Sequence, residues 1–86
     1  MIGIEQDGDE FIVTVQMTHT TTHRVTLKDA DHKALTGGAC DKATLIRHSF
    51  EFLLEHEPNT MILPAFDLPL ISRYFPDFEE DIRSRI

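Results

Sequence analysis

Apolar and polar residues alternate near the start of the chain, which is the pattern of strands that bury one face. The segment 10–17 alternates well and predicts one such strand. A weaker alternation in 2–6 predicts another, and Asp7-Gly8 between them is a pair that favours a tight hairpin turn. The side chains that we expect on the buried face of the stronger strand are Phe11, Val13, Val15 and Met17.

The chain then passes through a polar stretch of threonine and histidine, residues 18–23, which predicts a loop. Residues 24–27 predict a third strand that buries Val25 and Leu27. Connections this short join antiparallel neighbours. The first third of the sequence therefore predicts a three-stranded antiparallel meander with one apolar face.

The segment 41–57 predicts the central helix of the protein. At about 100° per residue, its apolar side chains cover an arc of about 200°, roughly twice that of an ordinary surface helix. Asp41 is suited to cap its start, and Pro58 prevents its continuation. So wide an apolar face must be covered on more than one side. The residues on it are Ala43, Leu45, Ile46, Ser49, Phe50, Phe52, Leu53 and Leu54.

Shorter helices complete the prediction. A short helix over 28–35 should stop at Gly37-Gly38, and prolines beyond the central helix divide the chain into short helical turns. Residues 68–75 and the segment after Pro76 predict two of them. Strands followed by helices indicate an α+β fold, and 86 residues suit a single domain spanning 1–86.

The composition indicates which cellular compartment and which classes of partner suit the protein. The formal net charge of −7 argues against general affinity for nucleic acid or anionic membranes. The single cysteine excludes an internal disulfide and suits a reducing compartment. The first residues do not resemble a signal peptide, and no apolar run reaches the about 20 residues of a membrane span. We therefore expect a cytoplasmic protein without membrane contact.

Candidate catalytic and metal-binding residues each have a simpler interpretation. His19 and His23 would lie about 13 Å apart on a strand, whereas zinc needs three or four close ligands. Ser49 lacks the glycine elbow of a nucleophile. Cys40 precedes a helix start, which can lower a thiol pKa, but no histidine partner is evident. The acidic residues of 77–81 lack the spacing of a calcium loop. We expect no catalytic residue, metal or cofactor.

The aromatic stretch 74–78 has two interpretations. In the first, Phe75 and Phe78 attach the last helix to the core. In the second, Tyr74, Phe75 and Phe78 form a contact surface for a partner protein, with Tyr74 at its rim. The sequence pattern is compatible with both.

Two resemblances add expectations. The segments 49–55, 66–68 and 71–76, which read SFEFLLE, FDL and ISRYFP, resemble a set of short bacterial proteins of unknown function. This resemblance covers about the last two-thirds of the chain and implies a compact cytoplasmic domain without assigned site residues.

The second resemblance is to ribbon-helix-helix transcription factors and antitoxins, through a strand at 23–27, a short helix at 29–36, a glycine turn and a helix containing 44–54. In that family the strand pairs with its twin in a dimer and enters the major groove. The resemblance implies a DNA-binding regulator. Its candidate base contacts would be Thr22, Arg24 and Thr26.

The leading hypothesis is a non-catalytic protein-interaction or regulatory domain, because large apolar residues are abundant and no convergent polar motif is present. A DNA-binding regulator and a small enzyme subunit are the alternatives. We also predict a homodimer, formed through an open edge at 24–27 or through an uncovered part of the central helix. The alternative to the dimer is a monomer in which 61–63, 68–71 and 75–82 wrap over that helix.

Overall fold

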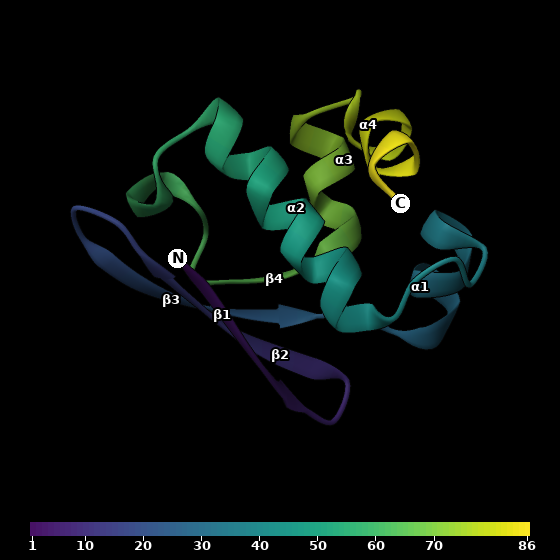
Figure 1. The fold of residues 1–86 in the computed structure, drawn as a ribbon, viewed down its shortest axis with the longest axis horizontal. Coiled ribbons are helices and arrows are strands. Elements are labelled where there is room, and N and C mark those ends of the chain that lie inside the picture. Colours follow the sequence, from purple (N-terminus) through teal and green to yellow (C-terminus); the bar gives the residue numbers. More distant parts are fainter.

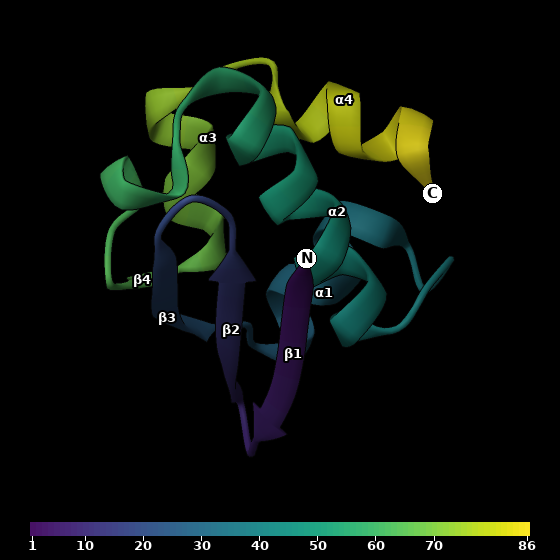
Figure 2. The same cartoon turned by 60° about the vertical axis from the view of Figure 1, so that its left-hand side comes forward.

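A four-stranded sheet forms one side of the molecule, and the helices lie against its inner face and at one of its ends (Figure 1). The computed structural model describes residues 1–86. Strands β1 (Ile2–Asp7), β2 (Glu10–Gln16) and β3 (Thr20–Thr26) form the predicted antiparallel meander. The strands follow the order β1-β2-β3-β4 across the sheet (Figure 2). The predicted α+β class is confirmed.

The fourth strand was not predicted from the sequence. Strand β4 (Ala65–Asp67) pairs with β3 in parallel, so that Phe66 lies opposite Val25. The backbone N–H of Arg24 also donates to the carbonyl of Pro64, at 2.8 Å. The prediction that residues 24–27 form an open edge is therefore wrong.

The two hairpins differ in detail from the predicted ones. Gly8 and Asp9 make the first turn, one residue later than expected, and Gly8 adopts a φ of 65°, which glycine tolerates without strain. Strand β3 begins at Thr20, so most of the predicted loop 18–23 belongs to the sheet. Met17 was expected to be buried, but β2 ends before it and its side chain is 58% exposed.

The central helix α2 (Lys42–His56) follows the short helix α1 (Asp29–Thr36). The glycine at the end of α1 and the cap at the start of α2 are as predicted, whereas α1 begins without a side-chain cap. Gly37 ends α1 with a left-handed φ of 62°. At the start of α2, a carboxylate oxygen of Asp41 accepts a hydrogen bond from the backbone N–H of Thr44, at 2.8 Å.

Helix α2 crosses the inner face of the sheet (Figures 1 and 2). It carries most of its predicted apolar face into the core. Ala43, at the first turn, is exposed instead, and Leu54 is half-buried. The buried side chains that α2 contributes are Leu45, Ile46, Ser49, Phe50, Phe52 and Leu53. The residues that oppose them, all fully buried, are Phe11, Val13, Val15 and Val25 of the sheet and Leu27 directly after β3.

The C-terminal third of the chain covers the apolar sides of α2 that the sheet does not reach, and its polar side stays mostly exposed. It contains two 3-10 turns, η1 (Asn59–Met61) and η2 (Leu68–Leu70), and two helices, α3 (Ile71–Tyr74) and α4 (Phe78–Arg85). These elements bury Ile62, Leu68, Ile71, Phe78 and Ile82 in the common core. The chain therefore wraps over most of the apolar face of its central helix, and only Ala43 and part of Leu54 stay uncovered on that face.

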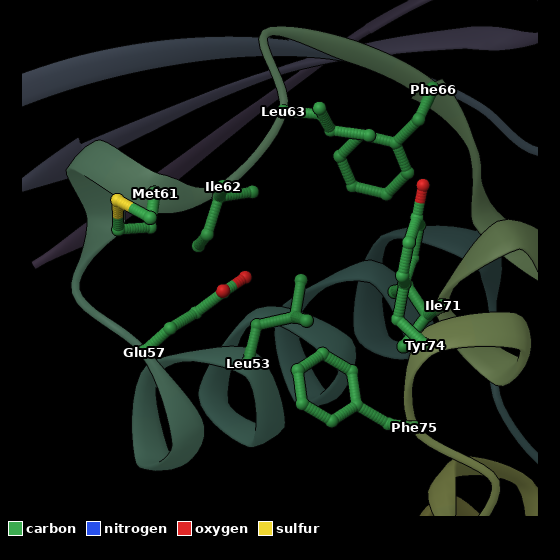
Figure 3. A pocket seen from close by; sticks show the side chains of 9 residues that line it. All are labelled: Leu53, Glu57, Met61, Ile62, Leu63, Phe66, Ile71, Tyr74 and Phe75. Atoms are coloured by element: carbon green, nitrogen blue, oxygen red, sulfur yellow. The ribbon is translucent and has the colours of Figure 1, made fainter.

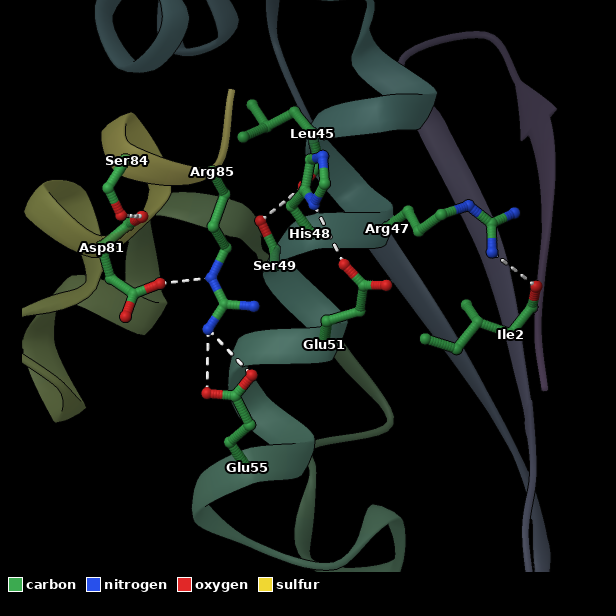
Figure 4. Close-up of polar contacts among 10 residues, drawn as sticks. All are labelled: Ile2, Leu45, Arg47, His48, Ser49, Glu51, Glu55, Asp81, Ser84 and Arg85. Carbon is green, nitrogen blue, oxygen red and sulfur yellow. Dashed lines mark hydrogen bonds and ion pairs between the residues drawn. The ribbon is translucent and has the colours of Figure 1, made fainter.

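An ion-pair network joins the last helix to the central one. The guanidinium of Arg85 donates to both carboxylate oxygens of Glu55, at 2.8 and 2.9 Å, and to Asp81 one turn earlier in α4 (Figure 4). The hydrogen bonds to these carboxylates raise the pKa of Arg85 above its usual value, and Asp81 has the larger effect.

None of the helices combines the length and the apolar character that a membrane span requires.

Candidate functional site

A pocket with a volume of about 420 Å³ opens beside the C-terminal end of α2 (Figure 3). Its walls come from the last turns of α2, from η1 and the loop that follows it, from β4 and from α3. Eight of its nine lining residues are hydrophobic, and the remaining one is acidic. They are Leu53, Glu57, Met61, Ile62, Leu63, Phe66, Ile71, Tyr74 and Phe75.

The local sequence explains why the chain builds a pocket here. Pro58 ends α2, so the backbone turns back through η1 and reaches β4. Three side chains, Leu53, Ile62 and Ile71, are buried and form the floor. Around them lies an exposed apolar rim, in which Met61 is 67%, Leu63 43% and Tyr74 66% exposed.

Glu57 provides the only charge in the lining. It directly follows the last residue of α2, and its half-buried side chain reaches into the pocket (Figure 3). Its carboxylate takes part in none of the ion pairs of the chain. The negative end of the α2 dipole lies at the same place. The pocket therefore combines an apolar surface with an unpaired negative charge.

A buried polar network holds the outer wall of the pocket against the sheet. Nδ1 of His23 lies 2.9 Å from the carbonyl oxygen of Leu63. A carbonyl oxygen can only accept a hydrogen bond, so Nδ1 is the donor. Nε2 of His23 lies 2.8 Å from the Thr21 hydroxyl, and this hydroxyl accepts from the side-chain amide of Asn59, at 2.9 Å. The same amide donates to the carbonyl of His19, at 2.8 Å. These bonds fix η1 and the rim residue Leu63 to β3.

The burial of His23 corrects the sequence interpretation, which placed this residue in a polar loop. The ring is 2% exposed and lies 5.4 Å from the ring of Phe50, centre to centre. The signal was present in the sequence: the inward alternation of Val25 and Leu27 reaches His23 when it is extended by one step.

The three aromatic residues proposed as a contact surface have different environments. Tyr74 and Phe75 line the pocket. Phe78 is fully buried and packs against the ring of Phe52, with the ring centres 5.3 Å apart. Phe78 therefore attaches α4 to the core, as the first interpretation of 74–78 expects, and is not available to a partner. Sequence reasoning missed the other exposed rim residues, Met61 and Leu63.

The residues that would contact DNA under the ribbon-helix-helix hypothesis lie on the outer face of the sheet, with Thr22 and Arg24 exposed and Thr26 half-buried. Arg24 is held by Glu10, at 2.6 Å, and lies 3.7 Å from Asp7; these carboxylates raise its pKa. Strand β3 pairs along its length with β2, and on its other side residues 24–26 pair with β4. This part of β3 therefore offers no free edge to a twin strand.

The candidate metal and thiol residues do not converge. His19 is exposed, both ring nitrogens of His23 have protein partners, and no group of three histidine, cysteine or acidic side chains is close enough to hold a metal. Burial, followed by the charge of Asp41, raises the pKa of the Cys40 thiol. This shift is opposite to the lowering that activates a thiol at a helix start.

We predict that the chain needs no structural metal. Adding EDTA should leave the midpoint of thermal unfolding unchanged, because both ring nitrogens of His23, the one buried histidine, have protein partners. Circular dichroism during heating measures the midpoint. A fall of several degrees that zinc reverses would contradict the prediction.

Comparison of the chain with protein-family models, with curated proteins and with solved structures found no match. The two resemblances noted in the sequence therefore stay predictions. The pocket and the residues around it are the basis for a functional proposal.

Proposed function

We propose that the protein is a non-catalytic interaction domain whose pocket receives an apolar side chain of a partner protein. The observation that carries the proposal is the apolar pocket with its exposed rim of Met61, Leu63 and Tyr74. Apolar patches of this kind mark interaction sites. Methionine adapts to different partners, and tyrosine supplies contact area with a polar end.

The lining favours binding over catalysis. General acid–base or nucleophilic chemistry needs several polar groups within hydrogen-bond distance of one another. The lining supplies the Glu57 carboxylate and the Tyr74 hydroxyl, surrounded by aliphatic and aromatic side chains. Binding to DNA has less support, since Arg24 is engaged by acidic neighbours and the chain is acidic. The single free cysteine supports a cytoplasmic location.

We expect that the protein no longer binds its native partner when Met61 and Tyr74 are both replaced by serine. The two exposed side chains contribute little to the core, so the fold should persist while the rim loses its apolar surface. Affinity capture from native lysate with wild type and variant, followed by mass spectrometry, measures the difference.

Met17→Ser is the matched control, because Met17 is an exposed methionine that does not line the pocket. It should retain the same partner. Capture of no specific protein, or of proteins that both variants retain equally, would contradict the proposal.

We propose a second mode of association, a homodimer formed through β1, which is the longer edge of the sheet. Met1 exchanges two backbone hydrogen bonds with Gln16 of β2. In an antiparallel pair of strands, every second residue is bonded to the neighbouring strand in this way, and the residues between point their backbone groups to the other side. The N–H and C=O groups of Ile2, Ile4 and Gln6 therefore point away from β2. Arg47 donates to the Ile2 carbonyl, at 3.1 Å (Figure 4), and the backbone N–H of Gln6 from a second copy would take its place in the dimer. Two copies would pair antiparallel about a two-fold axis at Ile4.

Light scattering after size exclusion should give twice the 9.9 kDa mass of one chain at micromolar concentration. Ile4→Pro should convert this species to the monomer, because proline lacks the outward N–H and is tolerated at a sheet edge. Ile4→Val, which keeps the N–H, should remain dimeric. A mass near 9.9 kDa over a wide range of concentration would reject the dimer.

A further inference from the structure

We infer that the partner segment bound by the pocket carries a lysine or arginine beside its apolar anchor residue, and that Glu57 pairs with this cation. The inference rests on the proposed function and adds the chemistry of the partner. It assigns Glu57 as the residue that determines specificity, while the apolar lining supplies contact area.

The first argument is the state of the Glu57 carboxylate. It is half-buried among apolar lining residues and has no basic partner in the chain. A neutral segment that covered the pocket would remove the remaining water from this charge without replacing it, which is unfavourable. A segment that carries a cation would offset this desolvation cost, because its positive charge pairs with the carboxylate as the water is removed. Glu57 therefore selects against neutral and acidic partners.

The second argument is the electrostatic potential at this end of α2. The helix dipole places partial negative charge at its C-terminus. Glu55, the nearest acidic residue along the chain, is already neutralised by Arg85, so it does not compete for an incoming cation. No basic side chain lines the pocket. The net charge of −7 strengthens the attraction for a basic segment at long range.

The third argument identifies the occupant as a polypeptide. A small-molecule site typically encloses about 70–90% of its ligand. Here the apolar surface continues outside the cavity, since Met61 and Tyr74 are about two-thirds exposed, at 67% and 66%. A small amine would leave that rim in water, whereas a segment of a partner would cover it.

Selection from a display library of random short peptides against the whole protein tests the inference. We expect the selected peptides to share an aliphatic or aromatic residue with lysine or arginine nearby. Fluorescence anisotropy with labelled peptides should then show about three- to tenfold weaker binding to Glu57→Gln than to wild type. Glu57→Lys should prefer peptides that carry an acidic residue at the same place.

Two controls separate charge recognition from loss of fold. Glu80→Gln removes the same charge from an exposed residue outside the pocket and should bind as wild type does. Replacing the peptide's lysine or arginine by alanine should weaken binding to wild type but have little further effect on Glu57→Gln. Thermal unfolding of each variant confirms that the domain is intact.

The outcomes distinguish the inference from the proposed function. The inference alone would be overturned if the selected peptides were not enriched in lysine or arginine and bound Glu57→Gln as tightly as wild type, while still failing to bind the variant with serine in place of Met61 and Tyr74. Tighter binding of an aliphatic amine such as n-octylamine than of any peptide would assign the pocket to a small ligand and overturn it as well. Failure to select any pocket-dependent peptide would overturn the proposed function.

Discussion

Replacing Phe50 by alanine should lower the free energy of unfolding by about 3–5 kcal/mol, which is most of the stability of a domain of this size. The ring is fully buried in the middle of α2. It lies between the helix and the sheet, with ring centres 5.4 Å from His23 on β3 and 6.2 Å from Phe66 on β4. Truncation would leave a cavity at this junction. Urea denaturation followed by circular dichroism measures the loss.

Glu51→Ala is the matched control, because Glu51 is the next residue along the same helix and points to solvent. Its carboxylate lies 3.0 Å from Nδ1 of His48 in an exposed contact (Figure 4). Loss of that contact should change the stability by less than about 0.5 kcal/mol. Equal effects of the two substitutions would contradict the assignment of the buried and exposed faces of α2.

The elements that could be predicted are those whose own sequence carries a regular pattern. The wide apolar arc of α2 requires burial wherever the helix packs, and Asp41 and Pro58 mark its ends. The alternation in β2 likewise predicts both the strand and its buried face. Such patterns are local, so they do not depend on which distant segment supplies the other half of the core.

The elements that could not be predicted depend on distant partners. Strand β4 has only three residues, too few for a recognisable alternation, and it becomes a strand because β3 offers it a hydrogen-bonding edge. The wrong expectation of an open edge at 24–27 followed from missing this strand. Met17 continues the alternation of β2 but is exposed, because the chain turns immediately after Gln16.

The candidate site was only partly predictable for the same reason. Tyr74 and Phe75 stood out by their aromatic character, but nothing local distinguishes them from Phe78, which is fully buried and packs against Phe52 of α2. Methionine and leucine occupy cores and rims alike, so the exposure of Met61 and Leu63 appears only when the turns after α2 are in place. The carboxylate of Glu57 stands out only because apolar side chains surround it in the folded chain, and the sequence does not show those neighbours.

Replacing His23 by alanine should lower the free energy of unfolding by about 2–4 kcal/mol, from the cavity and from the lost hydrogen bonds. Without the imidazole, the carbonyl of Leu63 loses its donor and the hydroxyl of Thr21 loses a partner. Because Leu63 belongs to the rim, the substitution should also loosen the outer wall of the pocket. Urea denaturation measures the first effect, and faster amide hydrogen exchange in residues 61–66 measures the second.

His19→Ala is the control for the last prediction, since His19 has the same side chain four residues earlier but is exposed. Its backbone carbonyl, which accepts from Asn59, is retained in the variant. The effect on stability should stay below about 0.5 kcal/mol, and exchange in 61–66 should not change. Comparable destabilisation by both substitutions would contradict the burial of His23. Normal exchange in 61–66 of His23→Ala would show that the imidazole does not hold the pocket wall.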